Sequence, residues 1–414
     1  MPFNMSAASN VLKVRYIGTV REQLNNEILL FKQLTKQIQM VSGKDFTVPL
    51  HTSRNVAAAI ARQDGDDLPN AGQQGYTTTL VPNKYLYSRI MVTGPTIAAT
   101  RDNAGAFVEA IQSEVDGVTR DMKRAINRML HGDGTDALAY WNAAADATPA
   151  GLDDGQGNNF VYVSGTDRLA LVDASALPTV AYLSTGGPTT NGIDFTVSRT
   201  AGGTYQAAWS TGAVAGSGIG DFLVKDQTLG NAMMGIRGVI SNVNPPLGPL
   251  QGIDALANEY WQAQVFGNGG TLRQLAFEDM QEVIDAIATN SDYTESDIKF
   301  ILTSHGMRRA YYKLCVAERR HVNTMKLDGG FTALDFNGLG LVADSQCRKN
   351  VMYFVVPDTM SIFRTSDFDW ADLDGSYLSR VANKDAYEGY LFHYGNLACL
   401  SRNGNGLLSD LIEA

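Results

Sequence analysis

One apolar stripe runs through residues 102–131 and is the most regular pattern in the chain. Its members recur at steps of three or four residues, as they do along one face of an α-helix. On the opposite face acids gather near the start and bases near the end, an order that complements the helix dipole. We therefore predict a long spine helix, capped by Asp102 and stopped by Gly132. The stripe consists of Phe107, Ile111, Val115, Val118, Met122, Ile126 and Met129, and the opposite face of Glu109, Glu114, Asp116, Arg120, Asp121, Lys123 and Arg124.

The N-terminal stretch shows a second helical pattern. Apolar residues from Leu24 to Ile38 recur at helical spacing, which predicts an amphipathic helix over residues 19–41. No other helix is predicted beside it in the sequence. Two interpretations are open, namely an arm that lies on another part of an assembly and a first helix of the core.

Residues 43–100 contain two strand patterns around a polar segment. The outgoing strand is predicted at 46–50 and the return strand at 77–91, and the segment Arg62–Gly75 between them is rich in turn-forming residues. An isolated ribbon of this kind is marginally stable in water. Because the nearby sequence offers little to cover its aromatic residues, we expect a neighbouring subunit to cover them. The predicted contacts of this extended loop are Arg62, Asp64, Asp66, Asp67, Tyr85 and Tyr87.

The rest of the chain alternates between strand and helix patterns. Seven short strand-like runs over residues 159–242, separated by turn residues, indicate an inserted all-β unit, a barrel or a sandwich. A helical pattern from Thr271 leads to a buried strand at 298–304 and a helix capped by Thr303 or Ser304, which indicates mixed α/β packing. The dipeptide Asn337-Gly338 predicts a type I′ hairpin. Further strands are predicted at 350–358, 360–366 and 385–401, the last beside the spine helix.

Composition narrows the class of protein. The chain has 414 residues and a net charge of −10, which suits it poorly to gripping phosphate backbones over a broad surface. It contains no apolar run long enough to span a bilayer. Its first residues lack the features of a signal peptide, so we expect the protein to stay in the compartment of its synthesis. Three widely spaced cysteines argue against a disulfide framework or a zinc module.

No catalytic constellation is visible. The five histidines are scattered, and no phosphate loop or nucleophile elbow is present. We predict no enzymatic activity, no catalytic or metal site and no cofactor. One basic cluster follows Ser304, and it could bridge carboxylates on adjacent subunits or face packaged DNA; the first suits an acidic protein better. Its predicted assembly contacts are Arg308, Arg309, Arg319 and Arg320.

Four stretches, in this order and at this spacing, resemble the major capsid protein of tailed bacteriophages, whose fold is shared with encapsulins. They are residues 84–115, 251–263, 327–344 and 385–403. The resemblance implies an α+β phage-capsid fold. Its parts would be an N-terminal arm (1–44), an extended β-hairpin loop (45–97), a peripheral domain with the spine helix (98–150), the inserted β-rich subdomain (151–250), an axial domain (251–365) and peripheral-domain strands with the C-terminus (366–414).

The resemblance also implies a function. Many copies would form the pentamers and hexamers of an icosahedral head, which encloses double-stranded DNA without binding it tightly and is assembled in the bacterial cytoplasm. A separate scaffolding protein, a portal and a decoration protein would be further partners. Two alternatives are a shell of the encapsulin type for cargo enzymes, and a β-rich binding or hydrolytic protein. The last would predict a signal peptide and a polar catalytic set, which the sequence does not show.

Overall fold

The computed structural model divides into two units. Unit 1 comprises Met1–Asn26, Tyr87–Lys123 and Phe368–Phe392, and unit 2 comprises Glu27–Leu86, Arg124–Asp367 and His393–Ala414. Four elements run from one unit into the other: α4 (Ala110–His131), β4 (Lys84–Thr93), β18 (Met360–Trp370) and β20 (Ala386–Cys399). The structure describes residues 28–34, 38–40, 43–55, 57–58, 60–64, 67, 70–100, 110–141, 150–153, 169–172, 180–183, 195–199, 205–209, 222–225, 227–317, 324–326, 332–372 and 378–414.

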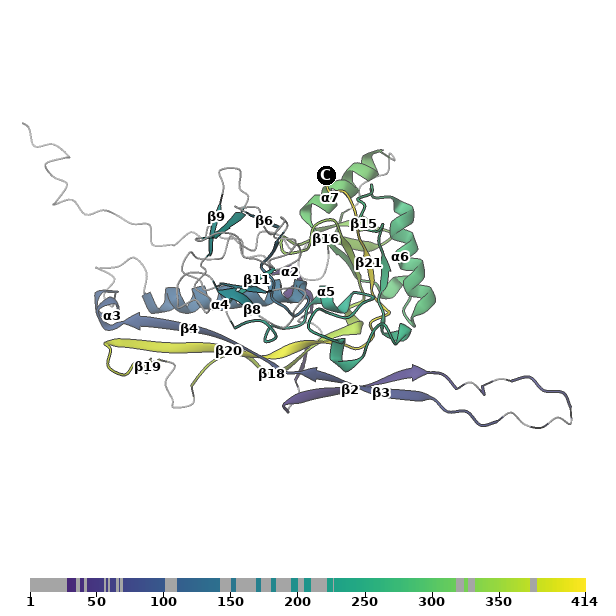
Figure 1. The fold of residues 1–414 in the computed structure, drawn as a ribbon, viewed down its shortest axis with the longest axis horizontal. Coiled ribbons are helices and arrows are strands. Elements are labelled where there is room, and N and C mark those ends of the chain that lie inside the picture. Colours follow the sequence, from purple (N-terminus) through teal and green to yellow (C-terminus); the bar gives the residue numbers. More distant parts are fainter. Residues whose placement is uncertain are drawn as a thin grey trace, which may run out of the picture. The chain divides into compact units, whose positions relative to one another are not determined.

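Helix α4 is the predicted spine helix (Figure 1). It ends at His131, directly before Gly132, as predicted. Its predicted beginning, with Asp102 and Phe107, lies outside the described residues. The prediction that Arg124 lies on the solvent face of this helix is wrong, because its side chain is only 6% exposed.

Unit 1 is built on strands β4 and β20, which pair with each other. The short strand β19 (Ser379–Arg380) pairs antiparallel with β20, and helix α3 (Gly94–Thr100) follows β4, where the Gly94 N–H donates to the Asp385 carbonyl at 2.9 Å. Helix α4 runs alongside these strands in Figure 1, and the Lys123 ammonium lies 5.7 Å from the centre of the Phe368 ring. The last long strand therefore accompanies the spine helix, as the sequence predicts.

In unit 2, β2 (Asp45–Ser53) and β3 (Gly75–Pro82) form a two-stranded antiparallel ribbon, which confirms the predicted hairpin. Pairing continues past Pro49, which lies opposite Thr78. The single return strand predicted over 77–91 is wrong, because the chain leaves the ribbon at Asn83 and continues as β4, which pairs with β20. The amide of Asn83 donates to the Thr365 hydroxyl at 3.0 Å and fixes this break.

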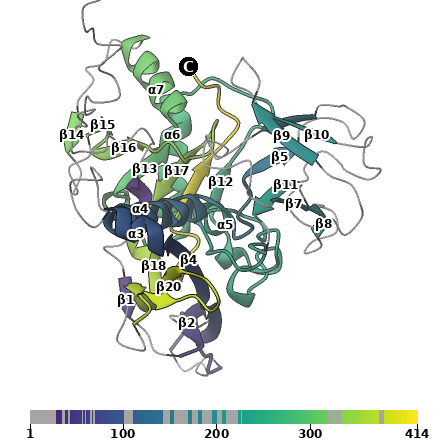
Figure 2. The same cartoon turned by 90° about the vertical axis from the view of Figure 1, so that its left-hand side faces the viewer.

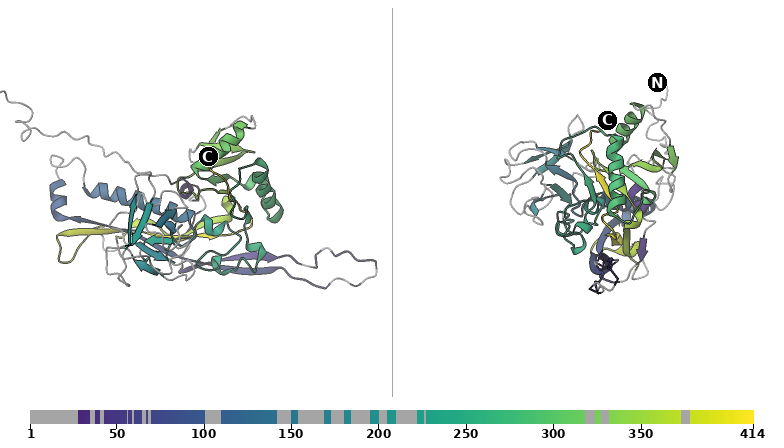
Figure 3. Two further views of the ribbon diagram at one scale, coloured as in Figure 1. Left: turned by 45° about the horizontal axis from the view of Figure 1, so that its top comes forward. Right: turned by 90° about the vertical axis from the view of Figure 1, so that its right-hand side faces the viewer.

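One hydrophobic core of unit 2 lies under a mixed seven-stranded sheet of order β12-β21-β17-β13-β16-β15-β14. Helices α6 (Phe277–Asn290) and α7 (His305–Ala317) pack on it (Figures 1 and 3). Four short turns, η3 (Leu250–Gly252), η4 (Glu259–Trp261), η5 (Glu295–Asp297) and η6 (Pro357–Thr359), connect longer elements. The strands are β12 (Gln264–Phe266), β13 (Phe300–Thr303), β14 (Thr324–Lys326), β15 (Thr332–Phe336), β16 (Leu339–Ala343), β17 (Met352–Val355) and β21 (Gly406–Leu408).

Local signals in this core were read correctly from the sequence. The hydroxyl of Ser304 accepts from the Met307 N–H at 3.1 Å and thus caps α7. Asn337 and Gly338 have φ values of 50° and 84°, as a type I′ turn between β15 and β16 requires. The helical pattern from Thr271 is realised later than predicted, since α6 begins at Phe277.

A second seven-stranded sheet of unit 2 has the order β8-β7-β11-β5-β6-β10-β9, and all its pairs are antiparallel (Figure 2). Five of the seven predicted runs contain its strands, whereas the run at 160–165 lies outside the described residues. The run at 233–241 is wrong as a strand, because α5 (Ile236–Val239) occupies it. Gly235 lies so close to α4 that an added Cβ would stand 2.4 Å from the Met129 carbonyl. The strands are β5 (Ala139–Trp141), β6 (Ala150–Asp153), β7 (Leu169–Val172), β8 (Val180–Leu183), β9 (Phe195–Arg199), β10 (Tyr205–Trp209) and β11 (Phe222–Lys225).

The structure differs from the N-terminal helix that the sequence predicts. Only α2 (Leu29–Leu34) is helical among the described residues of 19–41, and Ile38–Met40 forms strand β1 instead. The helix prediction is wrong there because β1 pairs in parallel with β18, so that Ile38 lies opposite Ile362. Residues 1–27 lie outside the described part of the chain.

Candidate assembly surfaces

The ribbon of β2 and β3 is anchored at one end and exposed at the other. At its base Phe46 and Val81 are buried, and the Phe46 ring meets Phe363 edge to face at 5.7 Å. On the opposite face of β3 Leu80 is 51% exposed, and farther out along the ribbon Tyr76 is 72% exposed. These exposed apolar side chains show that unit 2 does not cover this part of the ribbon.

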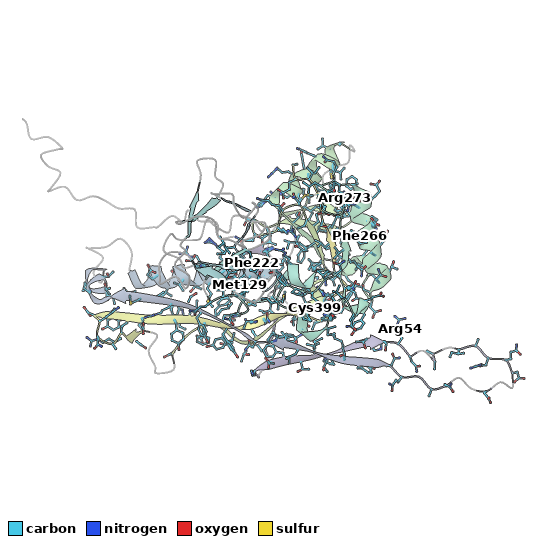
Figure 4. The ribbon with its side chains drawn as sticks, viewed as in Figure 1. Arg54, Met129, Phe222, Phe266, Arg273 and Cys399 are labelled. Atoms are coloured by element: carbon cyan, nitrogen blue, oxygen red, sulfur yellow. The ribbon has the colours of Figure 1, made fainter. Side chains whose placement is uncertain are left out.

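The loop that joins the two strands carries the predicted charged contacts. Arg62, Asp64 and Asp67 are all exposed, and Asp66 lies outside the described residues. Figure 4 shows Arg54 where β2 passes into this loop. Its guanidinium lies 3.9 Å from the Asp292 carboxylate, but both side chains are almost fully exposed, so the pair adds little stability.

A polar cavity of about 540 Å³ lies beside the ribbon in unit 2. Backbone and side chains of β2 line one side of it, and the segment after α6 lines the other, with Asp292, Tyr293 and Asn403 among its walls. Burial raises the pKa of the Tyr293 phenol, so this group remains a neutral hydrogen-bonding partner. The walls of the cavity thus offer hydrogen-bonding groups of both side chains and backbone.

Tyr85 and Tyr87 lie on β4 and not on the ribbon, which corrects their predicted place in the extended loop. The Tyr85 ring contacts Tyr394 at 5.2 Å within unit 2, and the Tyr87 ring contacts Tyr390 at 6.5 Å within unit 1. Their own chain therefore covers them in part, although they remain 49% and 60% exposed. Their role as contacts between subunits stays a prediction.

The basic cluster lies on helix α7. Arg308 and Arg309 are exposed, and the Arg309 Nε donates to the Ala414 carbonyl at 2.7 Å. Arg319 and Arg320 lie outside the described residues. The helix exposes Tyr312 and Lys313 on the same side, so the side of α7 turned away from the core is basic and partly aromatic.

The predicted spine core is only partly described. Met122 is 4% exposed and Ile126 is fully buried, whereas Val115 is half-buried. Ile111 lies in α4, and Phe107 lies outside the described residues. These values concern the packing of α4 and do not test a role in assembly.

Sequence reasoning missed a buried polar network at the end of α4. The carboxylate of Asp344 lies 3.0 Å from the His131 Nε2 and accepts from the Asn127 amide at 3.3 Å. Asn127 in turn accepts from the Phe31 N–H at 2.9 Å, which ties α2 to α4. Burial opposes the charge on Asp344, but His131 and these hydrogen bonds outweigh it and lower the pKa of the carboxyl.

A second missed feature is Arg402, which is fully buried. Its guanidinium forms no ion pair with a described carboxylate. It donates instead to four backbone carbonyls, those of Gly238, Val239, Val243 and Trp261, at 2.6–3.2 Å. Desolvation lowers the pKa of Arg402 to about 10. A single buried cation thus organises the segment between α5 and β12.

Two buried cysteines of unit 2 have raised pKa values. Burial raises the pKa of the Cys399 thiol to about 12 and that of Cys347 well above its usual range, so neither forms a thiolate readily. No group of His, Cys, Asp or Glu in the described part of the chain could hold a metal ion. None of its helices is both long and apolar enough to cross a membrane.

Comparisons with known proteins address the fold. No protein-family model matches the sequence, and the comparison with curated proteins gives no match. Solved structures do match over nearly the whole chain. One is the capsid asymmetric unit of cyanophage A-1(L), with 12% identity, a TM-score of 0.58 and coverage of 97% of this chain and 98% of the other.

Two further solved structures match the chain over nearly its whole length. The capsid of a native GTA particle has 8% identity and a TM-score of 0.55, with 100% of this chain and 99% of the other covered. The holo-SrpI encapsulin of Synechococcus elongatus has 8% identity and a TM-score of 0.51, with coverage of 99% and 96%. The chain therefore has the α+β capsid-protein fold that tailed phages and encapsulins share, as the resemblance in the sequence implies.

Proposed function

We propose that this chain is the major capsid protein of a tailed bacteriophage. Many copies assemble into the pentamers and hexamers of an icosahedral head. The observation that carries the proposal is the likeness to capsid subunits over 97% or more of the chain, with no large part left over for another activity. The acidic balance of the chain lets the enclosed double-stranded DNA pack without adhering to the wall.

The exposed ribbon supports this function independently. Tyr76 and Leu80 present apolar surface that unit 2 leaves open, and a second subunit is the partner that a symmetric shell supplies. Arg62, Asp64, Asp66 and Asp67 then lie in a contact loop. The subunit is structural and carries no catalysis, and a portal, a scaffolding protein and a decoration protein complete the virion, which is assembled in the host cytoplasm.

Expression of the whole chain, alone and with candidate scaffolding proteins, tests the proposal. Sedimentation and negative-stain microscopy should reveal closed particles or capsomers that convert to them. A protein that stays monomeric at high concentration under all these conditions would contradict it.

A loop variant tests the ribbon. Residues 54–74 are replaced by an Asn-Gly turn that joins Ser53 to Gly75, which are paired in the ribbon. The subunit should unfold at the wild-type temperature but give no particles. Normal particles would show that the loop is dispensable, and an unfolded variant would show that the loop belongs to the core of one chain.

An encapsulin-type shell is the second candidate, favoured by the likeness to the holo-SrpI structure. The two candidates differ in what the shell contains. Particles from cells that express this chain together with the genes encoded beside it should contain DNA if the phage-capsid proposal is correct. Particles filled with a co-encoded enzyme, and free of DNA, would favour the encapsulin.

A further inference from the structure

Two helices that pack on the same sheet of unit 2 expose charges of opposite sign. Helix α7 contains no acidic residue, and its exposed charges are Arg308, Arg309 and Lys313. Helix α6 contains no basic residue, and its exposed charges are the carboxylates of Glu278, Glu282 and Asp285. The rings of Phe277 and Tyr311, 6.1 Å apart, show that the two helices share one core.

Within the described chain these charges are not neutralised. Neither Arg308 nor Lys313 forms an ion pair with another described residue, and the same is true of Glu278 and Glu282. Each helix instead holds like charges four residues apart, such as Glu278 with Glu282, an arrangement that destabilises a helix. An oppositely charged partner surface would remove this repulsion.

The character of the basic face favours a protein as that partner. Tyr312 is 52% and Val316 57% exposed, and both lie on the same side of α7 as the charges. A phosphate backbone would leave these apolar side chains in water, whereas a protein surface can cover them. A net charge of −10 also opposes close binding of nucleic acid.

We propose that the partner is a second copy of this chain, and that the basic face of α7 in one subunit docks on the acidic face of α6 in the next. This inference rests on the proposed function and names one contact within it. At 1.5 Å per residue the exposed charges span about 7.5 Å on α7 and about 10.5 Å on α6, so each row covers between one and two helical turns. Because the two faces differ, the contact is head-to-tail, and repetition around an axis closes it into a ring.

Charge reversal tests the contact in the full-length chain. One variant carries Arg308→Glu with Lys313→Glu, another carries Glu278→Lys with Glu282→Lys, and a third carries all four changes. Each two-residue variant should weaken the contact about tenfold and lower the particle yield accordingly. The four-residue variant should recover particles, because opposite charges then meet again in every copy. The yield is measured by sedimentation and electron microscopy.

Controls separate this contact from general effects of charge. Lys299 is exposed in the same unit and lies on neither helix, so Lys299→Glu should leave the yield unchanged. The thermal unfolding of each unassembled variant should match the wild type. High salt should reduce the effect of each reversal by screening.

Three results would overturn the inference. The particle yield could stay unchanged in both two-residue variants, or the four-residue variant could assemble no better than they do. The α7 reversal could also lower only the nucleic acid content of the particles, measured by the ratio of absorbance at 260 and 280 nm, which would assign the basic face to nucleic acid. A wild-type chain that never assembles would refute the proposed function itself, and this inference with it.

Discussion

Arg402 provides the sharpest test of how unit 2 is held together. Its buried guanidinium joins the C-terminal segment to four backbone carbonyls of α5 and the segment that follows it. Two substitutions separate charge from geometry. Arg402→Met removes both the charge and the hydrogen bonds, whereas Arg402→Lys keeps the charge but loses the planar arrangement of donors.

The expected cost follows from two opposing terms. A hydrogen bond to a charged group contributes about 1.5–3 kcal/mol, and each buried carbonyl left without a donor loses about 1–3 kcal/mol. Against this stands the desolvation that lowers the pKa of Arg402 from 12.5 to about 10 and costs about 3 kcal/mol. Three of the four carbonyls have no other described donor, whereas that of Val239 also accepts from the Ser241 N–H at 3.1 Å. We therefore expect a net loss of about 3–5 kcal/mol for Arg402→Met. Arg402→Lys should lose about as much, because one ammonium cannot reach all four oxygens.

Trp261 supplies the assay. Its carbonyl accepts from Arg402, its indole N–H donates to the Leu250 carbonyl at 3.3 Å, and the side chain is 2% exposed. With the three other tryptophans replaced by Phe, the emission of Trp261 reports this segment alone during urea unfolding of the subunit. The midpoint should fall by on the order of 1 M urea in both variants. A wild-type midpoint for Arg402→Lys would refute the argument from geometry.

Three further predictions concern unit 2. Burial lowers the pKa of His393 to about 4, so the native state resists protonation of this side chain. The free energy of unfolding should therefore fall by up to about 3 kcal/mol as the pH drops from 6.5 to 4. The difference between wild type and His393→Leu in pH-dependent unfolding measures this loss. Asp344→Ala leaves His131 and Asn127 without their acceptor and should cost about 3–5 kcal/mol, with faster tryptic cleavage after Lys32 in α2 by mass spectrometry. Gly338→Val forces a β-branched residue into a φ of 84° and should cost at least about 1–2 kcal/mol in thermal unfolding, whereas an unchanged melting temperature would contradict the turn assignment.

The elements that the sequence predicts correctly are those specified by neighbouring residues. The turn at Asn337-Gly338 requires positive φ values that few other residues adopt, and Ser304 caps α7 through an atom three residues away. Helix α6 buries Met280, Ile284 and Ile287, as its stripe requires. In each case the sequence within one or two turns contains the whole cause.

The elements that were predicted wrongly depend on distant partners. Ile38 fits a helical stripe, but it pairs with Ile362, more than three hundred residues farther along the chain. Tyr85 continues the alternation of β3, and only β20 decides that the strand belongs to another sheet. The pattern places Arg124 on the solvent face although it is buried, because hydrophobic periodicity does not show which polar groups find buried partners.

The same limit applies to the assembly surfaces. The sequence predicts the exposure of Arg62, Asp64 and Asp67, because a polar segment between strands lies in water. It also shows the bases of α7, but not that an acidic helix shares their sheet. That relation arises from tertiary packing and needed the structure.

The ribbon of β2 and β3 has a consequence for the time before assembly. A sheet of two strands leaves an unpaired border along both sides, where any other extended polypeptide can attach. Pro49 removes one donor from such a border while its pairing with the other strand continues. A newly made subunit therefore carries its own protection against premature strand capture, and the risk of misassembly grows with the interval between synthesis and incorporation.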